Sequence, residues 1–249
     1  MKNAKILCVI PSRIASTRLP RKALTLIQGK PMVQWTYENA SRCRTLTKIV
    51  VATDSPEIAG VITRCGGTVE MTESSIPTGS DRAAVVAQRY PEMDVIINLQ
   101  GDEPFIKPQM LDELAQPFLR DEPLALAPEM ATLAFPLLPH EVSDPGVVKI
   151  VTDLNQNALY FSRSPIPYIR QQTEIPLLHH MGIYAFRRDF LKTYTQLPQT
   201  PLELTESLEQ LRAIEHGHRI RVCLTTHRTL EVNTPEELER AQTFVYEDS

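Results

Sequence analysis

The residues with the clearest chemical potential are cations that follow a short apolar run near the N-terminus. The run covers residues 6–10 and has the length and β-branched character of a buried strand. Pro11 has no amide hydrogen to give a β-ladder, so we expect the strand to end there. The loop beyond it carries the cations Arg13, Arg18, Arg21 and Lys22. Ligands of open α/β sheets bind beyond the carboxyl ends of strands, so this loop suits a polyphosphate, although a solvated basic loop has the same composition.

A carboxylate stands at the end of another predicted strand. Residues 95–99 form an apolar run, and Gln100, Gly101 and Asp102 lead the chain out of it. If the two strands are parallel, both loops open at the same edge of the sheet. One loop would then hold phosphates and Asp102 would bind a metal, because Mg²⁺ needs few protein carboxylates when a triphosphate supplies the other oxygens. Taken alone, Asp102 is also typical of an ordinary turn after a glycine.

Two common nucleotide-binding motifs are absent from the sequence. There is no G-x-x-x-x-G-K-[ST] run and no G-x-G-x-x-G after any predicted strand, and the chain has only nine glycines. This argues against a P-loop NTPase and against a Rossmann dehydrogenase. A strand followed by a loop of serines and arginines is a different way of holding phosphates.

The elements that must position these residues alternate in type along the first half of the chain. Strands are predicted at 6–10, 48–52, 68–71 and 95–99, with helices starting near residues 31, 56, 79 and 108. This alternation predicts a parallel sheet with right-handed crossovers. From about residue 129 the pattern changes to a strand at 130–135, a hairpin of 147–151 with 158–162, a strand at 179–186, a helix at about 206–216, a strand at 219–226 and a helix from Pro235.

The composition limits the possible classes of protein. With 249 residues and 42% hydrophobic content, the chain can bury a full core as one large domain or one domain with an insert. A net charge of −4 argues against a general nucleic-acid or membrane-surface binder. The four scattered cysteines indicate free thiols in a reducing compartment. We find no signal-peptide core and no run that could span a bilayer, so we expect a soluble cytoplasmic protein.

Eight sequence blocks occur in the order of one enzyme family. They are I-P-S-R-I-A-S-T-R-L-P-R-K (10–22), V-A-T-D (51–54), G-S-D-R (79–82), N-L-Q-G-D-E-P (98–104), A-L-Y-F-S-R-S-P-I-P (158–167), H-M-G-I-Y-A-F-R (180–187), L-E-Q-L-R (208–212) and N-T-P-E-E-L (233–238). Over essentially its whole length the chain closely resembles the 3-deoxy-manno-octulosonate cytidylyltransferases. The first block is shared with other sugar nucleotidyltransferases, whereas the blocks around 160–167, 180–184 and 208–212 single out this family.

The resemblance implies a fold and a reaction. The expected fold is α/β, with a three-layer, mostly parallel, Rossmann-like nucleotidyltransferase sheet. A smaller β-rich lobe for dimerisation and sugar binding, at about residues 129–200, would be inserted within a single domain, 1–249. The implied reaction joins CTP and 3-deoxy-manno-octulosonate (Kdo) to give CMP-Kdo and diphosphate for lipopolysaccharide synthesis, with Mg²⁺ as cofactor and a homodimer as the active form.

The resemblance also implies roles for individual residues. Arg13, Arg18 and Lys22 would hold the triphosphate, Arg82 and Gln100 would lie near cytosine and ribose, and Asp102 would bind the metal, with Arg13, Lys22 and Asp102 as the catalytic set. Arg163, His180, Tyr184, Glu209 and Gln210 would line the sugar pocket. Arg163 can pair with the Kdo carboxylate through two parallel hydrogen bonds. Taken singly, His180 and Tyr184 are also typical core residues, and Glu209 and Gln210 are typical of a solvated helix face.

The chain departs from the family at two positions. The family usually has Gly where Arg21 stands, so the loop is expected to be stiffer or to carry an extra cation facing the phosphates. The family has an Asp before T-P-E-[DE]-L as its second metal ligand, and this chain has Asn233 there. An amide oxygen remains an acceptable ligand for a hard cation, so Asn233 is retained as a second candidate metal ligand.

Two alternatives to a Kdo-activating enzyme stay open. The same fold could activate a related acid sugar, such as a sialic acid or 8-amino-Kdo. The chain could also be a non-catalytic protein that binds nucleotide as a sensor, for which the neutral Asn233 is the only support.

Overall fold

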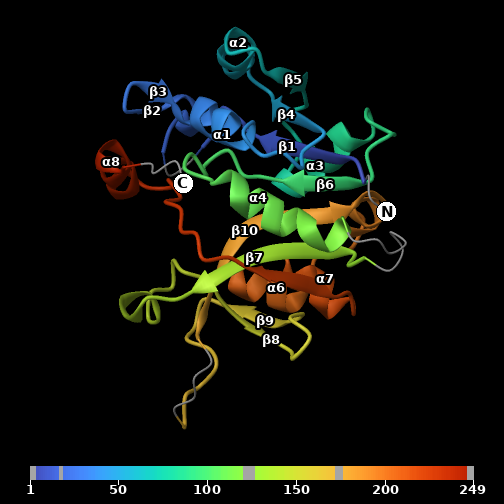
Figure 1. Cartoon of the computed structure of the whole chain (residues 1–249), viewed down its shortest axis with the longest axis vertical. Coiled ribbons are helices and arrows are strands. Elements are labelled where there is room, and N and C mark those ends of the chain that lie inside the picture. The colour runs from blue at the N-terminus through green and yellow to red at the C-terminus, as the bar shows by residue number, and fades with distance from the viewer. Residues whose placement is uncertain (1–3, 17–18, 120–126, 172–175, 246–249) are drawn as a thin grey trace.

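A single mixed sheet forms the centre of the computed structural model, which describes residues 4–16, 19–119, 127–171 and 176–245 (Figure 1). Within these residues the sheet has nine strands, and its main path runs β11-β7-β10-β6-β1-β4-β5. The strands on this path are β1 (Ile6–Pro11), β4 (Lys48–Thr53), β5 (Thr68–Met71), β6 (Val95–Asn98), β7 (Met130–Pro136), β10 (Leu178–Arg187) and β11 (Ile220–Leu224).

The parallel arrangement expected for the first half of the chain is confirmed. Strand β1 pairs in parallel with β4 on one side and β6 on the other, and β4 pairs in parallel with β5. In this register Val9 lies opposite Asn98, so the loops that follow β1 and β6 leave the same edge of the sheet. Pro11 still pairs with Ala52 at the last position of β1, because proline can occupy a strand end.

Strand β10 interrupts the parallel order. It runs antiparallel to both β6 and β7, while β7 pairs in parallel with β11 at the far side. The sheet is therefore mostly parallel along its main path, with one reversed strand in its interior.

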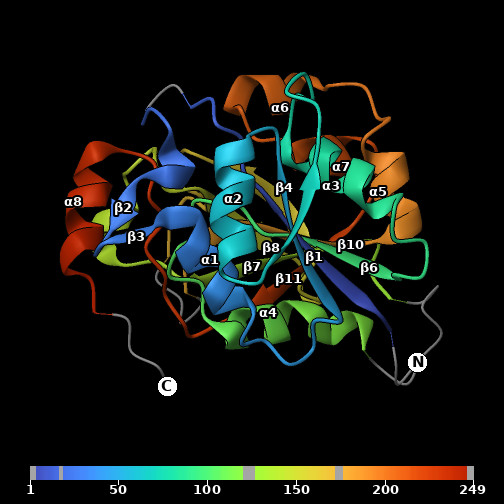
Figure 2. The same ribbon diagram turned by 90° about the horizontal axis from the view of Figure 1, so that it is seen from above.

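Helices cover both faces of the sheet, which gives the expected three layers (Figure 2). One face carries α1 (Met32–Ala40), α2 (Pro56–Arg64) and α4 (Pro108–Ala115), and the other carries α3 (Gly79–Ala87), α5 (Arg188–Tyr194), α6 (Pro201–Glu206) and α7 (Leu211–Glu215). Alternate residues of β1 face the two layers: Ile6 and Cys8 belong to one apolar cluster, and Leu7 and Val9 belong to the other. This alternation follows from the two-residue period of a strand.

The predicted hairpin is confirmed as β8 (Lys149–Thr152) and β9 (Ala158–Ser162), which pair antiparallel. Strand β8 joins the sheet through the first residues of β10, and the hairpin lies at the end of the molecule opposite α2 (Figure 1). The extent of an inserted lobe at about 129–200 stays a prediction. Strands β7 and β10 of that range belong to the main sheet.

The C-terminal helix α8 (Pro235–Thr243) packs against a small hairpin of β2 (Leu26–Ile27) and β3 (Lys30–Pro31). A separate apolar cluster that includes Ile27, Phe105 and Val232 joins them. The side chain of Gln28 donates hydrogen bonds to the Ala241 and Phe244 carbonyls at 3.2 and 2.8 Å. Short 3₁₀ turns complete the described elements: η1 (Lys22–Leu24), η2 (Gln116–Phe118) and η4 (Pro139–Glu141).

The single helix predicted for 206–216 is wrong. Two short helices, α6 and α7, occupy this region, and Ser207 between them has a left-handed backbone with φ 53°. Helix α6 begins earlier, at Pro201, where the Glu203 carboxylate accepts a hydrogen bond from the Thr200 amide at 3.2 Å. Ser55 caps α2, because its side chain accepts from the Ile58 amide, and the preceding Asp54 accepts a hydrogen bond from the Ile14 amide at 3.0 Å.

Two further expectations from composition can be compared with the structure. All four cysteines are free thiols, as expected; Cys8 and Cys43 are buried, whereas Cys65 and Cys223 are partly buried. In the described part of the chain, no helix combines the length and the apolar character needed to cross a membrane.

Candidate active site

A cavity of about 680 Å³ lies beyond the carboxyl ends of β1 and β6. Its walls come from the loop after β1, η1, the start of α3, the turn after β6, a bend in β10 and the turn between α6 and α7. Many of the candidate residues line it: Arg13, Lys22, Arg82, Gln100, Asp102, Tyr184 and Glu209. The structure therefore brings together in one cavity residues that are far apart in the sequence.

Lys22 and Asp102 meet across the cavity floor. The Lys22 ammonium lies 2.5 Å from Asp102 Oδ2 and also donates to Asn233 Oδ1 at 2.9 Å. Asp102 Oδ1 is buried and has no hydrogen-bond partner within the described residues. A buried, unpartnered carboxylate oxygen beside a cationic loop is suited to a hard divalent cation whose other ligands come from a bound phosphate chain.

Asn233 connects Lys22 to a second carboxylate. Its amide nitrogen donates to Glu231, while the helix N-cap is the next residue, Thr234. Asn233 is therefore not the N-cap of α8, although the capping box of α8 holds its backbone through Glu237 at 2.7 Å. Its single amide oxygen already accepts from Lys22, so a role as metal ligand would compete with that bond.

Two further carboxylates, Glu103 and Glu231, lie close to Asp102. Burial, together with the charges of Glu231 and Asp102, raises the pKa of Glu103 well above its usual value. Loss of hydration and the charge of Asp102 also raise the pKa of the Glu231 carboxylate to about 7. Lys22 is the cation that balances this cluster, which explains why it contacts Asp102 and Asn233 at once.

Gly101 allows the two loops to approach each other closely. A Cβ atom at this position would overlap the Ser12 hydroxyl and would lie 3.0 Å from the Pro11 carbonyl oxygen. The loop that carries the cations and the turn that carries Asp102 are thus in direct backbone contact. Only glycine fits between them without displacement.

Arg82 reaches the cavity from the first turn of α3 and is nearly fully buried. One of its nitrogens, Nη1, donates to the Thr72 hydroxyl, whereas the other, Nη2, is buried without a partner among the described residues. Burial and the charge of Arg13 lower the pKa of the Arg82 side chain, with Asp54 acting against them. A cation with an unused donor that faces an open cavity can hydrogen-bond a ligand there.

A bulge in β10 places Tyr184 and Gly182 on the cavity wall. The pairing of β10 with β7 shifts register between Met181 and Tyr184. The Thr132 hydroxyl of β7 lies inside this bulge, 3.0 Å from the Met181 carbonyl and 2.9 Å from the Ile183 carbonyl. Bulges of this kind redirect side chains next to functional sites.

Glu209 enters the cavity from the turn between α6 and α7. Burial raises the pKa of its carboxyl group, while a hydrogen bond from Ser80 acts in the opposite direction. Burial and the neighbouring Glu209 also raise the pKa of Tyr184. These two side chains line the same cavity as the cationic loop.

Three of the predicted sugar-binding residues do not line this cavity. His180 is buried behind Tyr184, within 3.0 Å of the Thr132 hydroxyl, and burial lowers its pKa to about 3. Gln210 is buried, and its Nε2 atom has no partner within the described residues. Arg163 donates from Nε to the Glu206 carbonyl at 2.9 Å and from Nη1 to the Pro145 carbonyl at 3.0 Å. Their roles in binding stay predictions.

Arg18 and Arg21 are the other two cations predicted in the loop after β1. Arg18 lies outside the described residues. Arg21 has a left-handed backbone with φ 55°, the conformation for which glycine is favoured, and its side chain forms an ion pair with Glu57. Arg21 does not line the cavity, so the expectation of an extra phosphate-facing cation is wrong for this structure.

Residues that the sequence did not single out also support the site. Ser80 contacts Glu209, Thr132 fills the bulge, and Glu206 accepts from the Arg163 amide at 3.0 Å. Ser80 belongs to the G-S-D-R block, which was a signal that could have identified it. Thr132 and Glu206 lie outside every quoted block, so nothing in the sequence marks them.

Comparison with known proteins gives consistent matches. Residues 7–220 match the family model described as cytidylyltransferase. A 3-deoxy-manno-octulosonate cytidylyltransferase of Acaryochloris marina is 49% identical over 96% of this chain and 97% of its own length. One of Geobacter sulfurreducens is 47% identical, with coverage of 94% and 97%.

Solved structures agree with these sequence matches. A CMP:2-keto-3-deoxy-manno-octonic acid synthetase complexed with CTP superposes with a TM-score of 0.89, at 42% identity over 96% of this chain and 97% of the other. A 4-diphosphocytidyl-2C-methyl-D-erythritol synthase of Anaerococcus prevotii gives a TM-score of 0.62 at 12% identity, with coverage of 96% and 94%. The second likeness concerns the fold alone.

Proposed function

The chain belongs to the 3-deoxy-manno-octulosonate cytidylyltransferase family, and on that premise we propose that it transfers CMP from CTP to the anomeric hydroxyl of Kdo, releasing diphosphate. The observation that carries this proposal is the cavity in which Lys22 and Asp102 meet at the ends of two parallel strands. A related enzyme that is 42% identical was solved with CTP, which supports CTP as the nucleotide.

The cationic end of the cavity suits the triphosphate. In the proposed reaction the Kdo hydroxyl oxygen attacks the α-phosphorus, its bond to phosphorus forms, and the bond to the diphosphate oxygen breaks. The hydroxyl loses its proton as its oxygen bonds to phosphorus, and negative charge develops on the leaving diphosphate oxygen, so catalysis depends on positioning and on fixed positive charge. Arg13 and Lys22 line the cavity where they can supply that charge, and Arg18 is proposed as a third phosphate-binding cation.

Residues on the adjoining wall suit the base and the ribose. Arg82 has an unused donor, and the Gln100 amide lies against Gly79 at the start of α3. We assign cytosine and ribose to this wall because amide and guanidinium groups can read the hydrogen-bonding edges of a pyrimidine.

Members of this enzyme family use a divalent metal, and we propose Mg²⁺ for this chain. Asp102 fits this ion because its Oδ1 atom is buried and unpartnered within the described residues. The metal would neutralise phosphate charge when bound. Asn233 is the weaker candidate because its oxygen accepts from Lys22.

The opposite end of the cavity suits a hydroxyl-rich acid sugar. Tyr184 and Glu209 can exchange hydrogen bonds with sugar hydroxyls. His180 and Gln210 lie behind them and Arg163 lies beside Glu206, next to cavity-lining Ser207. We propose that Arg163 pairs with the Kdo carboxylate once the sugar is bound.

We further propose a cytoplasmic homodimer that serves lipopolysaccharide synthesis. Exposed apolar side chains on and near the β8–β9 hairpin support self-association: Leu154, Leu159, Tyr168 and Ile169. Exposed large apolar side chains can take part in an interface between protein chains.

Diphosphate release from CTP tests the proposed function. Release that requires Kdo and Mg²⁺, and that yields CMP-Kdo, would support it. Parallel reactions with a sialic acid and with 8-amino-Kdo separate the alternative substrates. Tight CTP binding without release in the presence of any of the three sugars would favour the sensor instead.

A further inference from the structure

The turn that carries Glu209 into the cavity is held by a buried ion pair that the proposed reaction does not use. Arg212 of α7 donates from Nε to Glu203 Oε2 at 2.8 Å and from Nη2 to the other oxygen of the same carboxylate. The two side chains are 8% and 6% exposed. Glu203 belongs to α6, so the pair joins the two helices on either side of the turn.

The helices themselves cannot hold this turn. Helix α6 spans only Pro201–Glu206 and α7 only Leu211–Glu215. Helices of one or two turns are not stable alone in water, because the cost of nucleation exceeds the gain from so few hydrogen bonds. The left-handed Ser207 adds local strain at the junction. The position of Glu209 therefore depends on side chains that clamp the turn from outside.

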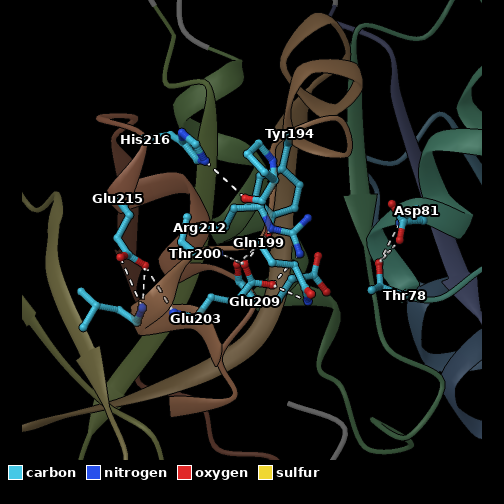
Figure 3. Close-up of polar contacts among 12 residues, drawn as sticks. Thr78, Asp81, Tyr194, Gln199, Thr200, Glu203, Glu209, Arg212, Glu215 and His216 are labelled. Atoms are coloured by element: carbon cyan, nitrogen blue, oxygen red, sulfur yellow. Dashed lines mark hydrogen bonds and ion pairs between the residues drawn. The ribbon is translucent and has the colours of Figure 1, made fainter. Parts of the chain in front are cut away.

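Tyr194 completes the clamp. The Arg212 guanidinium lies 5.7 Å from the centre of the Tyr194 ring, and the Tyr194 hydroxyl donates to the Glu209 carbonyl at 3.0 Å. Figure 3 shows Arg212 with Glu203 and Tyr194, and Glu209 beside them. Glu203 also accepts from the Thr200 amide, which fixes the start of α6. A series of contacts thus links α6 to the backbone of Glu209. Glu203 pairs with Arg212, Arg212 lies against the Tyr194 ring, and the Tyr194 hydroxyl donates to the Glu209 carbonyl.

We infer that Arg212 is a positioning residue for the sugar: with Glu203 and Tyr194 it holds the turn 207–210 so that Glu209 faces the cavity. This inference rests on the proposed function, because it assumes that Kdo binds in the part of the cavity lined by Glu209. The pair is nearly buried, and buried ion pairs contribute little net stability compared with apolar residues of similar size. Its geometric role is the orientation of the turn.

The experiment compares Arg212→Met, Glu203→Leu, and the double variant Arg212→Met/Glu203→Leu. Each single change leaves a buried polar partner unpaired and should lower the unfolding midpoint. The double variant should recover most of that loss, because it leaves no unpaired charge. The Michaelis constant for Kdo should nevertheless stay raised about tenfold in the double variant. Neither the two hydrogen bonds from the Arg212 guanidinium to Glu203 nor its contact with the Tyr194 ring is restored. The constant for CTP should stay within about twofold of the original value.

Tyr194→Phe gives a second measurement with little change in packing. It removes only the hydroxyl that holds the Glu209 carbonyl, so it should raise the Michaelis constant for Kdo severalfold and leave that for CTP unchanged. Arg89→Met is the matched control, since Arg89 also pairs with a glutamate, Glu70, but does not line the cavity. It should change neither constant.

The inference is overturned if the double variant regains both stability and the original Michaelis constant for Kdo, which would make the pair purely structural. It is also overturned if both substrates are affected equally. Failure of the proposed function would look different: the unmodified enzyme itself would release no diphosphate with Kdo.

Discussion

Adding one methyl group at Gly101 should separate the two loops that build the proposed phosphate-binding part of the cavity. The Cβ of Gly101→Ala would overlap the Ser12 hydroxyl and lie 3.0 Å from the Pro11 carbonyl oxygen. Comfortable heavy-atom contacts begin near about 3.5 Å, so the turn after β6 must move by at least about 0.5 Å from β1. Asp102 is the next residue and must move with it.

The size of the effect follows from this displacement. Overpacking of a rigid backbone contact costs about 1–3 kcal/mol of unfolding free energy. Displacement of a reacting group by about 1 Å can lower turnover by about 100-fold, so we expect a loss of about 10-fold or more. Urea unfolding measures the stability, and diphosphate release from CTP with Kdo measures the turnover.

A second substitution tests whether the overlap is the cause. Ser12→Gly removes the hydroxyl that the new methyl group meets, and that hydroxyl is buried without a partner in the described residues, so its removal breaks no hydrogen bond. The double variant Gly101→Ala/Ser12→Gly should therefore regain part of the turnover that Gly101→Ala loses. The fall in turnover from Ser12→Gly to the double variant should be smaller than the fall from the original enzyme to Gly101→Ala. Gly60→Ala is the control, because its Cβ meets only the flexible end of Arg64 at 3.3 Å within α2. Normal stability and turnover in Gly101→Ala would refute the close approach of the two loops.

Four further outcomes are expected. Asp102→Asn should lower turnover by at least about 100-fold with an unchanged circular dichroism spectrum, and near-normal turnover would remove Asp102 from the metal site. Arg163→Lys keeps the charge but loses the planar fork, so it should raise the Michaelis constant for Kdo and leave that for CTP unchanged; equal effects on both would argue against a sugar-specific role. Asn233→Asp should lower the Mg²⁺ concentration for half-maximal rate, whereas superimposable titrations would leave Asn233 as a partner of Lys22 alone. Burial lowers the pKa of His180 to about 3, so below pH 6.5 the folded state binds fewer protons than the unfolded state. The free energy of unfolding should therefore fall as the pH decreases from 6.5 toward 3. His180→Gln should flatten that dependence in urea titrations by up to about 1.4 kcal/mol per pH unit, and an unchanged slope would contradict the burial of a neutral imidazole.

The sequence was sufficient to predict that the loop after β1 and the turn after β6 lie together. Alternating strands and helices fix a parallel sheet, and a parallel sheet places the ends of β1 and β6 at one edge, which is where Lys22 and Asp102 meet. That inference needs only local patterns and a rule of topology. The contact between Gly101 and Ser12 could not be predicted, because it depends on the separation of two backbones.

The part of the cavity around Tyr184 and Glu209, where we propose that the sugar binds, was harder to predict because it depends on contacts that are distant in sequence. Reading 206–216 as one helix put Glu209 on a continuous helical face, whereas α6 ends at Glu206 and the left-handed Ser207 turns the chain so that Glu209 lines the cavity. The bulge that redirects Tyr184 is organised by Thr132 from a neighbouring strand. The ion pair that moves Arg21 away from the cavity likewise needs Glu57 of α2.

The reversed strand β10 has a consequence for how the chain can fold during synthesis. Strands β1, β4, β5 and β6 are complete once residue 98 has been made, but within the described residues the free edge of β6 pairs with residues 184–187 of β10. At about 5–20 residues per second, that edge stays open for several seconds on the ribosome. An open, apolar edge strand is a template for pairing with another chain. Substitutions that slow or weaken β10 should therefore reduce the yield of soluble protein more than they reduce the stability of the molecules that fold.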